Sequence, residues 1–469
     1  MNTDRDSEDT DINKLLLEMP GERMRRLCIG WLLLALGSLV VAGLLTIVIV
    51  MSRTPYIQDI FPWVDLFHTA LVVHVDLTVL VWFLGMAGVI WSFNSKENCT
   101  NCGWMALLLC VAGSAIISVS PFLGSGSPLM TNYIPVLNDP LFLAGLIVFG
   151  CGFLLLVLRG LFYSRPIGMR VTGLGALRFG LYSALIAAAT AIGALLASGL
   201  GMPDTIQGEY YFELLFWGGG HTLQFVHIQL MLVCWLWLAT VSGIASRLTP
   251  RIVMFLFAFG LIPVLMTPVV YIVYDMASAE HHSSLTRLMQ FGGGLAALPI
   301  GLVILFNLVN SMRGPARPSP QRSALFSSMI LFGVGGIIGF MIHGSNVTVP
   351  AHYHGSIVAV TLAYMGVTYH ILPLLGFRRP MDRPAILQPW IYASGQLMHV
   401  IGLAWSGGYG VQRKTAGGEQ ALDGIERIAG MGLMGLGGLV AVIGGIMFLV
   451  ITFKAMWPVK AGIPADRQA

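Results

Sequence analysis

Long apolar stretches separated by short polar connections make up most of the chain. A helix that crosses a bilayer needs about 20 mostly apolar residues, and the chain has twelve stretches of this kind. They lie at 27–51, 64–91, 104–123, 141–159, 177–199, 211–241, 251–274, 288–308, 325–342, 352–374, 387–408 and 427–453. The alternation of apolar and polar residues expected of barrel strands is absent from them. Because a backbone in lipid must satisfy its own hydrogen bonds, the pattern predicts an all-α integral membrane protein with twelve transmembrane helices.

The composition agrees with this prediction. The 469 residues are 56% hydrophobic and only 10% charged, whereas soluble globular proteins carry about 25% charged residues. Glycine is abundant, at 56 residues, as expected where transmembrane helices pack closely. Connections are short and we find no strong internal repeat. We therefore expect a tail at 1–26, a single membrane domain at 27–453 and a second tail at 454–469.

Lysine and arginine divide unequally between the two sides of such a bundle. With the N-terminus inside, 21 of the 26 fall on the inner side. The outer five are Arg53, Arg287, Arg413, Lys414 and Arg427. This asymmetry follows the positive-inside rule and predicts cytoplasmic N- and C-termini in a multi-pass protein of the inner (plasma) membrane. The first 26 residues lack a secretory cleavage pattern, so we expect the first helix to be an uncleaved anchor.

Six of the eleven histidines fall toward the outer side of this bundle. They are His74, His221, His281, His282, His352 and His354. A single histidine at a helix end is most often a hydrogen-bonded structural residue, but six at one depth on four segments indicate a site, because polar residues in a membrane are costly and usually functional. Neutral imidazole is also a common metal ligand. We expect the remaining five, His68, His227, His343, His370 and His399, to be structural.

The spacing of the six histidines divides them into groups. Residues two apart on a helix point about 200° apart, so His352 and His354 cannot share one metal but can hold two groups on opposite sides of their helix. His281 and His282 are adjacent at a helix end, and with His221 they can form a three-imidazole site. Three nitrogen ligands with an open position suit copper or iron. His74 can complete a pair of axial ligands around a planar macrocycle.

Five motifs around these histidines resemble the haem-copper oxidase superfamily, catalytic subunit I. The motifs are VVHVDLTVLVWFLGMAG, FWGGGHTLQF, EHH, AHYHG and GYGVQRK. The resemblance implies that His74 and His354 are axial ligands of a low-spin haem of b or a type. It implies that His352 is the proximal ligand of a high-spin haem, and that Arg413 and Lys414 bind haem propionates. The fold that it implies is the twelve-helix bundle of subunit I.

The resemblance further assigns His221, His281 and His282 to a non-haem iron or copper that faces the high-spin haem. Many oxygen reductases of the superfamily place a tyrosine one turn after the helix-6 histidine, where this chain has Phe225, preceded by Gln224. Reduction of O2 requires a local donor of an electron and a proton, whereas coupling of two NO molecules does not. We therefore favour reduction of NO to N2O. Reduction of O2 to water, with possible proton pumping, is the alternative.

Two further residues are candidates for catalysis together with Gln224. C-type oxidases supply a tyrosine six residues before the paired histidines, and here Tyr274 lies seven residues before His281. NO reductases of the superfamily carry a glutamate near the non-haem iron, and Glu280 directly precedes the histidine pair. Aspartate and glutamate residues in the outer half of the predicted bundle suggest that protons enter from the outer side of the membrane.

The expected partners follow from the same resemblance. We expect a small gaseous substrate, membrane lipid, no nucleic acid, and a separate electron-donating subunit with copper or haem c. Cytochrome c or a cupredoxin is the expected donor. A twelve-helix secondary transporter would share the helix number and the charge bias but would not need the histidine pattern. A transporter would show no Soret absorption band.

Cys99 and Cys102 form the motif CTNC in a predicted cytoplasmic loop. A lone CxxC is a weak sign of metal binding, and this one lacks the following histidine needed for covalent c-type haem attachment. We expect a loop dithiol without function.

Overall fold

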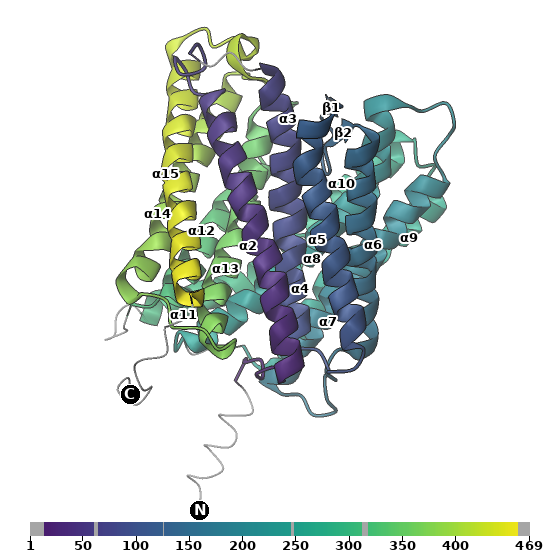
Figure 1. Cartoon of the computed structure of the whole chain (residues 1–469), viewed down its shortest axis with the longest axis vertical. Helices are drawn as coiled ribbons and strands as arrows, with labels where there is room; N and C mark the ends of the chain where they lie inside the picture. The colour runs from purple at the N-terminus through teal and green to yellow at the C-terminus, as the bar shows by residue number, and fades with distance from the viewer. Residues whose placement is uncertain (1–13, 61–63, 125, 245–247, 312–317, 458–469) are drawn as a thin grey trace, which may run out of the picture.

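The computed structural model describes residues 14–60, 64–124, 126–244, 248–311 and 318–457, and these form one helical bundle (Figure 1). The parts of the predicted tails at 1–13 and 458–469 lie outside the described residues. In the described ranges, β-structure beyond isolated bridges consists of one two-stranded antiparallel hairpin on the side opposite the chain termini.

The elements follow one another with short connections. The helices are α2 (Glu22–Met51), α3 (Val64–Val75), the π-helix η1 (Asp76–Trp82), α4 (Phe83–Phe93), α5 (Thr100–Leu123), α6 (Pro140–Tyr163), α7 (Gly173–Leu200), α8 (Gly208–Val241), α9 (Pro250–Val273), α10 (Ala279–Gly292), α11 (Gly294–Ser311), α12 (Pro320–Gly339), α13 (Thr348–Leu374), α14 (Asp382–Gly408), the 3-10 helix η2 (Gly417–Gln420) and α15 (Ile425–Met456). The strands are β1 (Ser127–Leu129) and β2 (Val136–Asn138).

Eleven helical segments among the described residues are long and apolar enough to cross a membrane. The predicted all-α membrane bundle is therefore confirmed. The predicted span that falls below this hydropathy criterion is α14, which packs along α15. Its polar side chains face other helices: Gln388 is fully buried, donates to the Gly444 carbonyl (3.1 Å) and accepts from the Tyr369 hydroxyl (3.1 Å). The count of twelve transmembrane helices remains a prediction.

Three helices begin with the same two-residue signal. Asp139, Thr249 and Ser319 cap α6, α9 and α12, and each is followed by a proline in the first helical turn. A short polar side chain accepts a hydrogen bond from a free backbone N–H at the helix start, and proline fits there because it has no N–H to satisfy. These signals fix where the three helices begin.

The centre of the bundle is formed by α8 and α13. Of their most apolar windows, 83% and 78% of the residues are buried, the highest shares among the eleven segments. Polar atoms inside this core are paired across helices: the Trp235 indole donates to Ser328 Oγ (2.8 Å), and Ser328 Oγ donates to the Ala359 carbonyl (2.6 Å). The predicted ligands His221, His352 and His354 all lie on these two central helices.

Two predicted spans are interrupted. The second span passes through the π-helix η1, which begins two residues after His74, and π-helical turns inside α-helices frequently mark functional sites. The span predicted at 288–308 begins earlier, at Ala279, and is divided at Gly293 into α10 and α11. His281 and His282 therefore lie in the first turn of a helix that Ser278 caps, and not in irregular backbone after the preceding helix.

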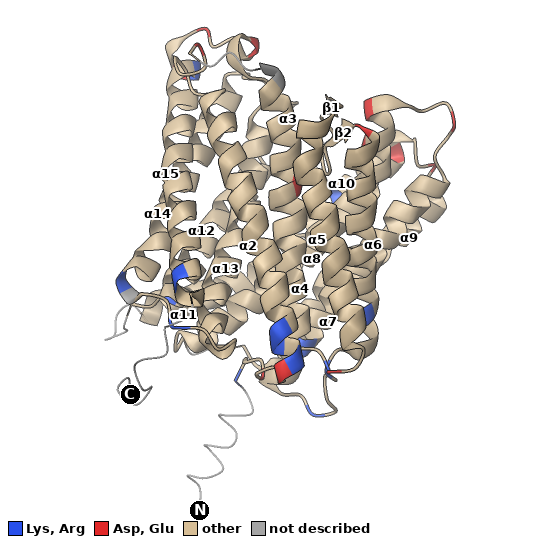
Figure 2. Ribbon diagram, in the orientation of Figure 1, with Lys and Arg blue, Asp and Glu red and all other residues tan. Residues whose placement is uncertain are grey.

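Charged residues separate along the bundle. Figure 2 shows most Lys and Arg near the end where both termini lie, and most Asp and Glu near the opposite end. This distribution supports the predicted orientation, with the termini in the cytoplasm, which remains a prediction.

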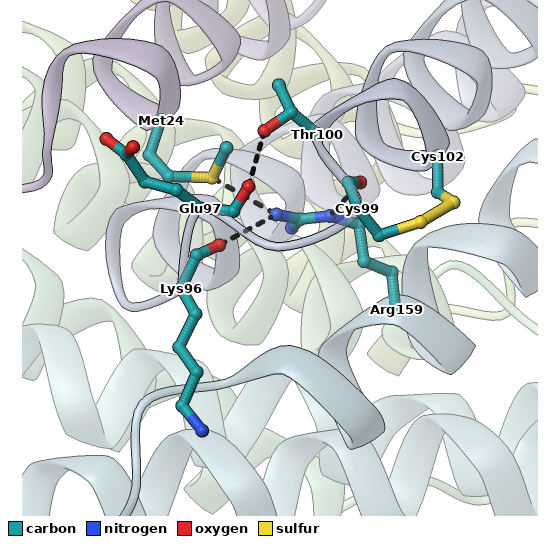
Figure 3. The surroundings of a disulfide bond; sticks show 7 residues. All are labelled: Met24, Lys96, Glu97, Cys99, Thr100, Cys102 and Arg159. Carbon is teal, nitrogen blue, oxygen red and sulfur yellow. Dashed lines mark hydrogen bonds between the residues drawn. A yellow bond between two sulfur atoms is a disulfide. The ribbon is translucent and has the colours of Figure 1, made fainter.

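Cys99 and Cys102 are joined by a disulfide and are not the two free thiols that we expected (Figure 3). Their Cα atoms are 5.3 Å apart, within the range that a disulfide spans. The loop around them is held by Arg159, which is buried and donates to the Cys99 carbonyl (3.2 Å) and the Lys96 carbonyl (3.2 Å). The pair stiffens the turn at the start of α5.

Candidate haem and metal centre

Four predicted ligands share one hydrogen-bond pattern. Their Nδ1 atoms donate to backbone carbonyls: His74 to Ala42 (3.1 Å), His221 to Trp217 (2.8 Å), His352 to Gly335 (2.7 Å) and His354 to Pro350 (2.9 Å). A carbonyl oxygen can only accept, so the proton lies on Nδ1, and Nε2 of the neutral ring keeps its lone pair. An Nδ1–H fixed in this way orients the ring and raises the basicity of Nε2 as a ligand. All four side chains are therefore prepared to bind a metal through Nε2.

His68 differs from these four. Its Nε2 lies 3.1 Å from the Lys414 carbonyl, so Nε2 carries the proton. A ring fixed in that tautomer presents no Nε2 lone pair to a haem iron. The contact fits the structural role that we expect for His68 on α3.

His352 and His354 face different neighbours, as their spacing predicts. His352 bonds to the Gly335 carbonyl of α12, and it lies so close to Gly339 that a Cβ there would be 2.7 Å from its Nδ1. The His354 ring lies 5.0 Å from the ring of His399 on α14. Two groups can therefore bind on opposite sides of α13.

The His399 ring is a neighbour of the predicted low-spin haem ligand that the sequence pattern did not single out. Its Nδ1 donates to the Met434 carbonyl of α15 (3.0 Å), so its Nε2 also keeps a lone pair. His354 lies close enough to interact electrostatically with both His74 and His399. The three half-buried rings come from α3, α13 and α14.

His221 and His282 both contact the indole of Trp217, and His281 lies beside His282. The Trp217 ring lies 4.6 Å from the His221 ring and is stacked on the His282 ring at 4.7 Å. The His281 and His282 rings are 6.2 Å apart. Tyr271 packs edge-on against His281, with ring centroids 4.7 Å apart. Each of the three histidines is thus in contact with an aromatic side chain.

The donor atoms of this cluster fit a metal. Both ring nitrogens of His281 and Nε2 of His282 are buried without a hydrogen-bond partner in the described part of the chain. An unpaired buried polar atom costs about 1–3 kcal/mol, and coordination would satisfy these nitrogens. Across the described ranges, no three His, Cys, Asp or Glu side chains are already close enough to hold an ion. Coordination therefore requires histidine rings of the cluster to turn toward one another.

Arg413 and Lys414 lie in the loop between α14 and α15, at the end of the bundle opposite the chain termini. Arg413 Nε donates to Ser345 Oγ (3.2 Å), and Lys414 Nζ donates to the Met130 carbonyl. Burial, with the charge of Arg413, lowers the pKa of Lys414 to about 8. A carboxylate beside Lys414 would raise this pKa again, so an anion and the lysine proton stabilise each other. The pair is suited to bind anionic groups such as haem propionates.

The three predicted catalytic residues are less closely associated with the cluster. Tyr274 is the residue that ends α9, and it is 39% exposed. Glu280 is exposed in the first turn of α10, and Gln224 is half-buried on α8. Tyr271, one turn before Tyr274, is the helix-α9 tyrosine whose ring contacts a histidine of the cluster.

An open cavity of about 640 Å³ leads toward this cluster between α8 and α10. Trp217 and His282 line its inner part, and Ser283, Thr286 and Arg287 are among the polar residues that line the rest. The cavity gives water and small molecules a path to the histidines from one side of the bundle.

A membrane-embedded helical bundle that presents buried and half-buried neutral histidines with free Nε2 atoms is suited to bind haem and a further metal, which is typical of a membrane redox enzyme. The chain belongs to the family "Cytochrome C and Quinol oxidase polypeptide I", whose model matches residues 26–447. It is therefore a catalytic subunit I of the haem-copper oxidase superfamily, as its motifs predict.

Two relatives are similar over most of their lengths. An uncharacterized protein of Rickettsia prowazekii (strain Madrid E) is 28% identical over 501 aligned positions, which cover 92% of this chain and 96% of the relative. An uncharacterized protein of Aquifex aeolicus (strain VF5) is 29% identical over 360 positions, which cover 75% of this chain and 86% of the relative. Neither name states a substrate.

Proposed function

We propose that this chain binds two haems and one non-haem metal and reduces nitric oxide to nitrous oxide. In this proposal His74 and His354 ligate a low-spin haem, and His352 ligates a high-spin haem. The hydrogen bonds from Nδ1 to backbone carbonyls support these roles, because they leave Nε2 free on each ring. Arg413 and Lys414 would hold haem propionates.

The non-haem metal, iron or copper, would be held by His221, His281 and His282. The buried nitrogens of His281 and His282 that lack partners within the described residues support this assignment. When bound, the haems and this metal supply electrons to the substrate and an open coordination position for it. The protein side chains would orient these groups.

The observation that carries the choice of substrate is Phe225. It lies one turn after His221 on α8, is 4% exposed and packs near Gly292 of α10. A phenyl ring supplies neither the electron nor the proton that O2 cleavage requires at this position. NO coupling, 2 NO + 2 H⁺ + 2 e⁻ → N2O + H2O, needs no such donor. The cavity lined by Ser283 and Thr286 is a route by which protons can reach the site.

Reduction of O2 to water is the second candidate, and Tyr271 favours it. Its ring contacts His281, and its hydroxyl lies 2.8 Å from Ser198 Oγ, a hydrogen bond that fixes the phenol. A tyrosine in that place could supply the electron and proton that Phe225 cannot. Tyr274, the tyrosine that we predicted for this role, is more exposed and lies at the end of the helix.

Purified enzyme assayed with both gases tests the proposal. Under the NO assignment, Tyr271→Phe leaves NO turnover within a few fold, because it removes one hydrogen bond worth about 0.5–1.5 kcal/mol. Under the O2 assignment, the same change lowers O2 turnover by orders of magnitude. Tyr274→Phe makes the same test for the tyrosine that directly follows α9. Rapid O2 turnover that is lost in Tyr271→Phe, or in Tyr274→Phe, would contradict NO reduction.

Metal analysis of the wild-type enzyme gives a second, independent measurement. Two haem irons with one further iron support the NO assignment, and two irons with one copper support O2. Ala variants of His221, His281 and His282 should each lower the non-haem metal content without large loss of haem. Full occupancy in all three variants would remove this site.

The expected surroundings complete the proposal. The chain would lie in the plasma membrane with both termini in the cytoplasm, which the charge separation in Figure 2 supports. Electrons would arrive from a subunit with copper or haem c, supplied by cytochrome c or a cupredoxin. The histidine cluster would then lie toward the outer side, where such donors bind.

A further inference from the structure

A small hairpin between α5 and α6 reaches the histidine cluster. Strands β1 and β2 pair antiparallel, with Ser127 opposite Asn138 and Leu129 opposite Val136. Val136 and Leu137 are 0% and 1% exposed. Burial of these apolar side chains fixes the base of the hairpin in the bundle, and its tip, residues 130–135, projects from this anchored base.

The tip is clamped from two sides. The Asn132 backbone N–H donates to Glu213 Oε2 (2.9 Å), and its side-chain amide donates to the other oxygen of the same carboxylate. From the opposite direction, Lys414 donates to the Met130 carbonyl. Thr131 closes the tip by donating to the Ile134 carbonyl (2.6 Å). These bonds hold the tip against α8 and against the loop before α15.

Tyr133 at this tip lies against the predicted metal ligand His221. The two rings are 4.8 Å apart and inclined by 56°, and the Tyr133 ring meets Trp217 edge-on at 5.9 Å. A Cβ at Gly220 would overlap Tyr133 Cγ, so glycine at this place is what admits the ring. Two aromatic side chains, from α8 and from the hairpin, thus contact the His221 imidazole.

The Tyr133 ring is half-buried beside the His221 imidazole. Its packing restricts the rotation of the imidazole, while the bond from His221 Nδ1 to the Trp217 carbonyl fixes the tautomer.

We propose that Tyr133 is a positioning residue for the non-haem metal ligand His221, delivered by the clamped hairpin. The proposal rests on the proposed function in one respect, that His221 is a ligand. Tyr133 acts through His221 by holding the direction of its Nε2 atom. Metal affinity depends on such support, and loss of an outer-shell partner typically costs about 10–100-fold.

The test measures metal and haem content separately in the purified enzyme. Tyr133→Ala removes the ring, and Gly220→Ala displaces it without changing any polar group. Both should lower non-haem metal per protein several-fold, with both haems retained. Tyr133→Phe keeps the ring and should keep the metal. Gly193→Ala on α7, where an added methyl group meets nothing within 4 Å, is the matched control.

Asn132→Ala provides a variant that leaves the aromatic contacts intact and weakens the clamp by removing the side-chain bond to Glu213, without changing any charge. We expect a smaller metal loss from it, and it replaces Tyr133→Ala if that variant does not accumulate. Full metal occupancy in Tyr133→Ala and Gly220→Ala would overturn the proposal. Equal loss of haem and metal would also overturn it, because that result indicates a general folding role.

His221→Ala separates this inference from the function on which it rests. If His221→Ala keeps its metal, the ligand assignment is wrong and this proposal is wrong with it. If His221→Ala loses the metal but Tyr133→Ala and Gly220→Ala retain it, the ligand assignment stands and the positioning role alone is wrong.

Discussion

At the scale of single residues, the tautomer distinguishes four of the six predicted ligands from His68. A histidine has two nitrogens that could bind metal, and a backbone carbonyl at hydrogen-bond distance decides which one keeps its lone pair. The predicted haem ligands His74, His352 and His354 use Nδ1 for this bond, whereas His68 uses Nε2. Spacing and depth in the sequence selected the ligands, and the hydrogen bonds give a separate physical reason for the choice.

The low-spin haem provides the first residue-scale prediction. His74→Ala or His354→Ala removes an axial ligand and should abolish the sharp reduced α-band while the high-spin signal remains. His68→Ala, on the same helix as His74, should leave the α-band in place. Optical spectra of the reduced enzymes measure both. A full six-coordinate spectrum in either His74→Ala or His354→Ala would make the ligand assignment wrong.

His399 allows a finer prediction at the same site. Its ring lies 5.0 Å from the His354 ring, so it contacts a proposed ligand without being one. His399→Leu should shift the midpoint potential or the α-band position of the low-spin haem and should leave haem content unchanged. Redox titration followed at the α-band measures this. An unchanged potential and an unchanged band would return His399 to the structural role that we expected for it.

Several residues of the site could not be predicted from the sequence. Trp217 precedes His221 by four residues, a spacing that places both on one helix face, so a signal for it existed. Tyr133 gives no such signal. It lies far from His221 in the chain, and only the tertiary packing of the hairpin brings the rings together. Tyr271 and Tyr274 are one turn apart, and spacing from His281 alone did not show which ring contacts it.

At the scale of elements, continuous apolar stretches predicted the long helices well, because burial in lipid requires them. Short or polar elements were missed. The strands Ser127–Leu129 and Val136–Asn138 have three residues each, too few to show a period. The start of α10 at Ala279 was missed because its first turns carry His and Ser in place of apolar residues. The π-helix after His74 has no signature in residue type.

The contact between α12 and α13 yields an element-scale prediction. A Cβ at Gly335 would lie 2.6 Å from the Ser356 backbone nitrogen, an atom that cannot move aside. Gly335→Ala should therefore separate the helices and destabilise the protein by about 1–3 kcal/mol, the usual cost of overpacking. Gly336→Ala, where an added Cβ meets nothing within 4 Å, should be nearly neutral.

Unfolding of both glycine variants in detergent micelles measures the difference in stability. The spectrum of the high-spin haem gives a second measurement, because the Gly335 carbonyl accepts the bond from His352 Nδ1. Equal stability of the two variants would show that the α12–α13 contact tolerates an added methyl group.

At the scale of the whole molecule, three of the six predicted ligands lie on the two most buried helices, α8 and α13, and a cavity opens beside α8. Sequence analysis predicted the bundle and the family, because hydropathy and motifs are local properties. The cavity could not be predicted in this way, since its lining joins residues of α8 with residues of α10 across tertiary contacts. Count and orientation of the membrane spans remain predictions from hydropathy and charge.

The helix α14 has a consequence for the biogenesis of the protein. A translocon recognises a span by its own hydropathy. The α14 sequence is less apolar than the eleven other segments because it carries polar residues such as Gln388 and His399, which face protein neighbours. The isolated segment should therefore partition poorly, and it should enter the bilayer together with α15 as a helical hairpin. A glycosylation acceptor placed between residues 417 and 420 reports this in microsomes. In chains that end at residue 424 the acceptor should remain largely unmodified, whereas in chains that include α15 it should be glycosylated. Efficient modification of the shorter chain would show that α14 inserts without its partner.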